Sequence, residues 1–111
     1  HSFQHDWGHL LENFVFLELR RADYTIEYYR TNSGKEVDFL ATDSHGEESL
    51  IQVTAQMDDP DTRQRELNAL FEAMRERGKR EAIVITLHHE EHLKNESGHI
   101  HIMPAWLWAL K

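Results

Sequence analysis

Two short stretches of the chain place polar side chains among apolar ones, and together they have the form of a functional site. The first, Gly-Lys-Glu-Val-Asp-Phe-Leu over residues 34–40, carries Asp38, and the second, Leu-Ile-Gln-Val-Thr over residues 50–54, carries Gln52 and Thr54. If both are strands joined by a tight turn, Asp38 lies across from Gln52. Because an unpaired buried polar group costs about 1–3 kcal/mol, each of these side chains needs a partner or a ligand.

Alternation along a strand predicts which of these side chains share a face. Glu36 and Asp38 should point to one face of the first stretch, with Val37 and Phe39 on the other. Lys35 should point away from Asp38 by the same rule. In the second stretch the two polar residues again share a face, opposite the apolar ones.

Composition narrows the class of protein. The chain has 111 residues, no cysteine, and a net charge of -8 with its nine histidines taken as neutral. This length suits one domain over residues 1–111, and the acidic balance lowers the expectation of nonspecific nucleic-acid binding, which rests on Lys and Arg. No apolar run approaches the ~18 residues of a membrane span, so we expect a cytoplasmic domain with no membrane partner. The first residue is not Met, which indicates a piece of a longer polypeptide.

The elements that must position the polar residues begin with a helix predicted over residues 5–21. Its apolar residues recur at three- and four-residue spacing. They are Trp7, Leu10, Leu11, Phe14, Val15 and Leu17. Glu12 falls on the flank of this apolar stripe, whereas Glu18 falls in its middle and is expected to be an ion-pair partner.

Three strands and a second helix should follow. Strands are predicted over residues 24–31, 35–41 and 49–56, which would form a three-stranded meander. Asp59 is expected to cap a helix that has Pro60 in its first position and ends at Gly78. Its buried stripe should consist of Leu67, Leu70, Phe71 and Met74. Its solvated residues should include Arg63, Arg65, Glu66, Arg75 and Glu76.

The last third of the chain completes an α/β pattern. A continuous apolar run over residues 81–87 predicts a central strand covered on both faces. The polar residues 88–98 predict a loop, residues 99–103 a short last strand, and Pro104 the start of a C-terminal helix. The order α-β-β-β-α-β-β-α predicts an α/β domain with a mixed sheet flanked by helices.

Four pieces of the chain together resemble one protein family. They are residues 10–15 (Leu-Leu-Glu-Asn-Phe-Val), 29–40 (from Tyr29 to Leu40), 50–54, and 102–106 (Ile-Met-Pro-Ala-Trp). In this order they resemble the C-terminal domain of unknown function of bacterial and archaeal AAA-type ATPases. The resemblance implies a P-loop ATPase domain elsewhere in the polypeptide. ATP would bind only there, since this chain has no G-x-x-x-x-G-K-[ST] motif.

The α-β-β-β-α-β order also resembles the restriction-endonuclease-like core of PD-(D/E)xK nucleases, which include Holliday-junction resolvases. That resemblance implies a site made of Glu12, Asp38, and two third-strand positions occupied here by Gln52 and Thr54. Both of those residues depart from the family pattern of an acid and a lysine. Glu12, Asp38 and the Gln52 carbonyl would hold Mg²⁺ only weakly, because a neutral amide attracts the ion less than a carboxylate does.

These departures favour a catalytically degenerate nuclease-like domain that acts as an interaction or regulatory module for the ATPase domain of the same polypeptide. Two alternatives stay open. One is an active Mg²⁺-dependent DNA or RNA endonuclease with a rearranged site, and the other is a protein-binding domain whose acidic surface meets a basic partner. The residues also have a purely structural interpretation, in which Asp38 bonds to basic groups or backbone N–H groups while Gln52 and Thr54 form a polar ladder.

Overall fold

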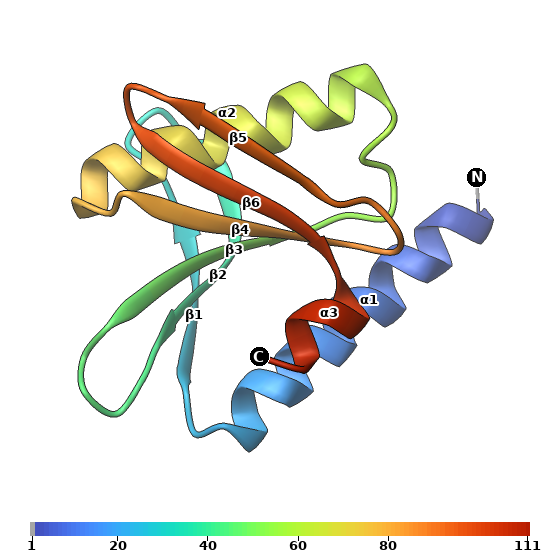
Figure 1. The fold of residues 1–111 in the computed structure, drawn as a ribbon, viewed down its shortest axis with the longest axis horizontal. Coiled ribbons are helices and arrows are strands. Elements are labelled where there is room, and N and C mark those ends of the chain that lie inside the picture. Colours follow the sequence, from blue (N-terminus) through green and yellow to red (C-terminus); the bar gives the residue numbers. More distant parts are fainter. Residues whose placement is uncertain (1) are drawn as a thin grey trace.

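Six strands form one mixed sheet with helices on both of its faces (Figure 1). A computed structural model describes residues 2–111, with side chains from residue 6 onward. The elements are α1 (Ser2–Arg21), β1 (Thr25–Arg30), β2 (Glu36–Thr42), β3 (Glu48–Val53), α2 (Pro60–Arg77), β4 (Glu81–Thr86), β5 (Glu91–Asn95), β6 (Gly98–Pro104) and α3 (Ala105–Ala109). The predicted α/β class, mixed sheet, flanking helices and C-terminal helix are confirmed.

The sheet has the strand order β1-β2-β3-β4-β6-β5. β1, β2 and β3 form the predicted antiparallel meander. β4 runs parallel to β3, and α2 supplies the crossover that a parallel pair requires. β6 is parallel to β4, and β5 closes the far edge antiparallel to β6.

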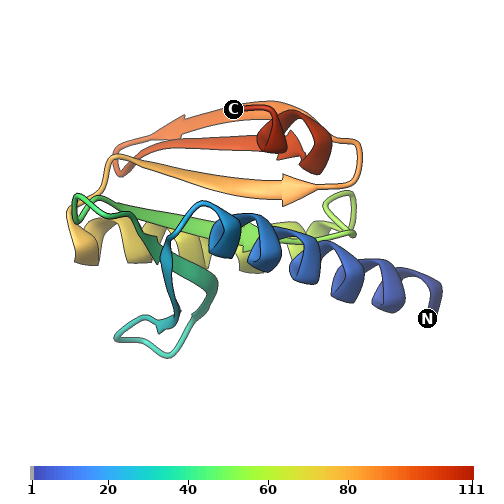
Figure 2. The same cartoon turned by 90° about the horizontal axis from the view of Figure 1, so that it is seen from below.

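Each face of the sheet has its own hydrophobic core. α2 packs Leu70 and Met74 against Leu50 and Val84 on one face. α1 covers the other face, and the residues of α3 that join it there are Ala105 and Trp108. Figure 2 shows α1 lying along the sheet. α1 also contacts α3, because the ring of Phe14 meets that of Trp108 edge-on, with 6.5 Å between their centroids.

Capping residues set both ends of α2, as the sequence predicts. The Asp59 carboxylate accepts hydrogen bonds from the backbone N of Thr62 at 2.9 Å and from its hydroxyl at 2.7 Å. Pro60 occupies the first turn, and Gly78 ends the helix in the left-handed conformation, with φ 67°. A residue with a Cβ adopts this φ only at a cost, which explains the glycine.

The apolar residues of α1 divide between two sides of the helix. Leu11, Val15 and Leu19 are buried against the sheet, whereas Leu10 and Leu17 are exposed. The predicted single stripe is therefore too wide, because one helix face buries an arc of roughly 100° against a sheet. No helix in the described part of the chain is long and apolar enough to cross a membrane.

A fifth strand occupies part of the predicted loop over residues 88–98. β5 pairs with β6 through a tight turn and lies at the edge of the sheet, where both faces of a strand can stay polar. Its only large apolar residue, Leu93, packs against the core under α2. One apolar residue gives too little alternation to predict a strand, and this is why the loop prediction is wrong.

Candidate functional site

A β-bulge in β2 positions Asp38. In the pairing of β1 with β2, the single residue Tyr28 faces two residues of β2, Asp38 and Phe39. The extra residue breaks the alternation, so Val37 packs in the core under α2 and Phe39 packs with the core under α1. The prediction that Val37 and Phe39 share a face is therefore wrong, because a bulge shifts the side-chain register by one.

Gln52 is buried and joins β2 to β3 beyond their last backbone pair, Phe39 opposite Ile51. Its Oε1 accepts a hydrogen bond from the backbone N of Asp38 at 2.8 Å. Its Nε2 donates to the carbonyl of Glu36 at 2.9 Å and to the carbonyl of Glu66 in α2 at 3.4 Å. The amide thus takes the place of ladder hydrogen bonds where the strands separate, and it also ties them to the helix.

The Asp38 side chain likewise accepts a hydrogen bond from a backbone N–H of the opposite strand. Its Oδ2 accepts from the backbone N of Val53 at 2.8 Å. The pKa of the Asp38 carboxyl is raised to about 6. Burial is the main cause, the hydrogen bond from Val53 acts against it, and the charges of Glu12 and Glu36 add to the rise. Asp38 and Gln52 therefore each satisfy backbone groups of the opposite strand, an exchange that we call the strand clamp.

Glu66 is the site residue that the sequence analysis missed, since it was expected to be solvated. It projects from α2 into the cavity that Asp38 lines. Burial, followed by the charge of Asp38, raises the pKa of Glu66 to about 7. Its Oε1 is buried, and no described residue donates a hydrogen bond to it. The helix periodicity contains a signal for this placement, because Glu66 lies one turn before buried Leu70 and two turns before buried Met74.

Of the other two predicted site residues, Glu12 affects this cluster through its charge and Thr54 lies outside it. Glu12 is exposed on α1, yet it is close enough for its charge to raise the pKa of both Asp38 and Glu66. Thr54 is buried, and its hydroxyl accepts a hydrogen bond from the backbone N of Gln56 at 3.1 Å. Thr54 is not among the residues that line the acid cavity. The structure thus brings Asp38 and Gln52 together, keeps Glu12 within reach of Asp38 only through its charge, and leaves Thr54 in a local turn.

The acid cavity is small and mixed in charge. Its volume is about 320 Å³, and its lining comprises Gly34, Lys35, Glu36, Asp38, Gln52, Arg65, Glu66 and Ala69. The ammonium of Lys35 lies 3.1 Å from a carboxylate oxygen of Glu72 and also donates to the Ser33 hydroxyl. The Arg65 guanidinium lies 3.7 Å from Glu66 Oε2. Both basic side chains of the lining therefore already have acidic neighbours.

The residues of this cluster do not fit a Mg²⁺ site in their present arrangement. Mg²⁺ requires near-octahedral oxygen ligands at about 2.0–2.1 Å. Gln52 Oε1 and Asp38 Oδ2 each receive a backbone N–H instead. Within the described residues, no group of three or more His, Cys, Asp or Glu side chains is arranged to hold a metal ion.

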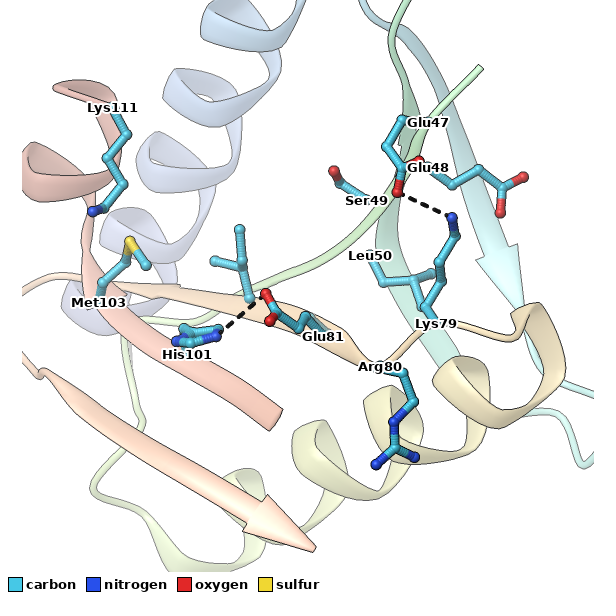
Figure 3. A pocket seen from close by; sticks show the side chains of 12 residues that line it. Glu47, Glu48, Ser49, Leu50, Lys79, Arg80, Glu81, His101, Met103 and Lys111 are labelled. Carbon is cyan, nitrogen blue, oxygen red and sulfur yellow. Dashed lines mark hydrogen bonds and ion pairs between the residues drawn. The ribbon is translucent and has the colours of Figure 1, made fainter. Parts of the chain in front are cut away.

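A second hollow, of about 460 Å³, opens at the opposite end of β3 and β4 (Figure 3). It is larger than the acid cavity, and it contains two close contacts between basic and acidic groups. The ammonium of Lys79 lies 3.2 Å from Glu47 Oε2, and His101 Nε2 lies 3.6 Å from Glu81 Oε1. The acid cavity is the stronger candidate for a functional site, because Glu66 Oε1 is buried there and no described residue donates a hydrogen bond to it.

Comparison with known proteins places the chain in a family. Residues 7–108 match the family described as "Domain of unknown function (DUF4143)". The chain is 32% identical over 124 residues to the uncharacterized protein MJ1544 of Methanocaldococcus jannaschii, and the alignment covers 98% of the chain but only 26% of that relative. No solved structure matches the chain. The chain therefore belongs to the DUF4143 family.

Proposed function

We propose that this chain is a catalytically degenerate, nuclease-like module with an interaction or regulatory role for an AAA-type ATPase domain in the same polypeptide. The observation that supports it most directly is the strand clamp. The resemblance to PD-(D/E)xK nucleases implies that Asp38 and Gln52 would be metal ligands, yet an oxygen of each accepts a hydrogen bond from a backbone N–H of the opposite strand. Their present contacts serve to hold β2 and β3 together at the bulge.

The protonation of the acids supports the same proposal. The pKa of Glu66 is about 7 and that of Asp38 about 6, both raised chiefly by burial. Near neutral pH a large share of Glu66 carries its proton, and the cluster then offers less negative charge to a cation than its composition suggests. Thr54 stands where the family pattern has a lysine, and its hydroxyl is engaged in a turn.

The ATPase context rests on resemblance and on length. The quoted sequence pieces resemble the C-terminal domain of AAA-type ATPases, and the relative from M. jannaschii has most of its length outside the aligned region, since the alignment covers 26% of it. That additional length is sufficient for a P-loop ATPase domain, which this chain lacks. The α-β-β-β-α-β order of the first six elements likewise supports a nuclease-like ancestry.

One observation favours a competing function, an active endonuclease with a rearranged site. Glu66 brings a carboxylate from α2 to the side of Asp38, where it supplies the acid that Gln52 lacks. In this alternative Glu66 and Asp38 would be the essential acids, and the Gln52 amide would only support them.

A cleavage assay separates these functions. The domain is incubated with branched, single-stranded and duplex DNA and with RNA, in Mg²⁺ or Mn²⁺, beside an Asp38→Asn variant that keeps an oxygen acceptor for the Val53 N–H. We expect no cleavage by the wild type above the level of the variant. Cleavage that Asp38→Asn and Glu66→Gln both abolish would establish the competing function.

The ATPase context has its own test. Full-length MJ1544 is expected to hydrolyse ATP, and removal of its region equivalent to this chain should change the rate of hydrolysis or its dependence on partners. A full-length relative without ATPase activity would refute the ATPase context and leave the result of the cleavage assay unaffected.

A further inference from the structure

The outer side of α1 carries an apolar stripe that the sheet does not cover. Trp7, Leu10, Phe14 and Leu17 are 40%, 59%, 37% and 50% exposed. Their spacing of three, four and three residues alternates between the first and fourth positions of a heptad, so they line one side of the helix. This is the spacing with which one helix packs along another, and it lies on a different arc from the residues that contact the sheet.

The exposed apolar area of the α1 stripe is large for a single domain. At about 200 Å² for a fully exposed large apolar side chain, its members together expose roughly 350–400 Å². The largest exposed apolar patches on typical monomers are about 300–600 Å² and often mark interaction sites. A stable interface buries about 800 Å² per partner, somewhat more than half of it apolar. The stripe therefore supplies most of the apolar area that one side of such an interface needs.

Charges at the two ends of α1 favour one orientation of a helical partner. Asp6 is exposed near the first turn, whereas Arg20 and Arg21 are exposed in the last turn. In an antiparallel pair of identical helices, the acidic end of each meets the basic end of the other, and the two helix dipoles oppose one another. A parallel pair would instead bring like charges together. Arg21 has an ion pair within its own chain, to Glu18 at 3.0 Å. The Arg20 guanidinium lies 5.8 Å from the centroid of the Phe16 ring, a contact with no acid, so Arg20 is the main partner for Asp6.

The shape of the molecule leaves room for this approach. In both views the N-terminal turns of α1 extend past the ends of the strands (Figures 1 and 2). A second backbone can therefore approach these first turns without meeting the sheet.

We propose that two copies of this chain associate through α1, with the stripes packed against each other in an antiparallel, two-fold arrangement. A two-fold interface needs only one self-complementary patch, and α1 supplies both the apolar area and the opposite charges. This inference rests on the exposed side of α1 alone and does not require the proposed function.

Sedimentation equilibrium of the purified chain over roughly 1–300 µM tests the proposal, since this range spans weak to moderate interface affinities. We expect a monomer–dimer equilibrium in which Leu10→Glu combined with Leu17→Glu raises the dissociation constant at least tenfold. The control is Leu110→Glu at the end of α3, where an apolar residue is 77% exposed outside the stripe. It should leave the dissociation constant unchanged. Circular dichroism checks that each variant is folded.

A charge exchange tests the antiparallel orientation, and it provides a second test of the dimer if one of the leucine variants fails to fold. Asp6→Lys should weaken the dimer, and combining it with Arg20→Glu and Arg21→Glu should restore it. A chain that stays monomeric throughout the concentration range would overturn the proposal. A Leu110→Glu effect as large as that of the stripe variants would overturn it as well, and failure of the charge exchange would refute the antiparallel arrangement.

Discussion

Replacement of Gln52 by Met tests whether the strand clamp stabilises the fold. Met matches Gln in length and volume, so the change removes the three hydrogen bonds of the amide and leaves almost no cavity. The backbone N of Asp38 loses an acceptor at 2.8 Å, and the carbonyl of Glu36 loses a donor at 2.9 Å. A buried group left unsatisfied costs about 1–3 kcal/mol, and the Glu36 carbonyl can recover water because Glu36 lies at the surface. We therefore expect a loss of about 2–3 kcal/mol in the free energy of unfolding.

Urea unfolding measures this loss, with Gln64→Met as the matched control. Gln64 is exposed on α2, and its Nε2 donates a hydrogen bond to Oδ1 of Asn68 in the next turn at 2.9 Å. Its replacement should change stability by less than about 0.5 kcal/mol. If Gln52→Met cost no more than this control, the strand clamp would not be a stabilising feature of the fold.

Two further predictions concern Glu66 and Gly98. Because burial and the charge of Asp38 raise the pKa of Glu66 from 4.5 to about 7, ionising Glu66 destabilises the folded chain, an effect absent below about pH 4.5 and complete above about pH 7. The free energy of unfolding of Glu66→Gln, measured by urea titration, should therefore exceed that of wild type by about 1–3 kcal/mol at pH 8 and equal it at pH 4.5. The same difference at both pH values would contradict the raised pKa of Glu66. Gly98 has φ 138°, and a Cβ there would lie 2.2 Å from the carbonyl oxygen of Arg80, so Gly98→Ala should lower stability by more than about 3 kcal/mol or prevent folding. A melting temperature close to that of wild type would show that the β5–β6 turn adapts.

Local signals in the sequence were sufficient for the elements whose ends are set by neighbouring residues. Asp59, Pro60 and Gly78 bound α2 because a cap acts within one turn of its own residue. The meander and the central strand also follow from runs of β-branched residues, which pack on a pleated surface wherever they occur.

Features that depend on distant partners could not be read in the same way. The bulge at Asp38 exists only in the pairing of β2 with β1, so alternation alone put Val37 and Phe39 on one face. Glu66 is charged and was expected to be solvated, yet packing of Leu70 and Met74 fixes the rotation of α2 and carries Glu66 inward. The residues of the candidate site could thus be named in part, but their mutual contacts depend on how α2 and the bulge meet.

Calorimetric titration of Mn²⁺ into the wild-type chain and its Asp38→Asn variant tests the central claim most directly. The claim is that Asp38 and Gln52 hold strands together and do not form a metal site. It predicts no saturable binding heat for either protein near neutral pH. Saturable binding of about one ion per wild-type chain that Asp38→Asn removes would contradict the claim and would assign the acid cluster to metal-dependent chemistry.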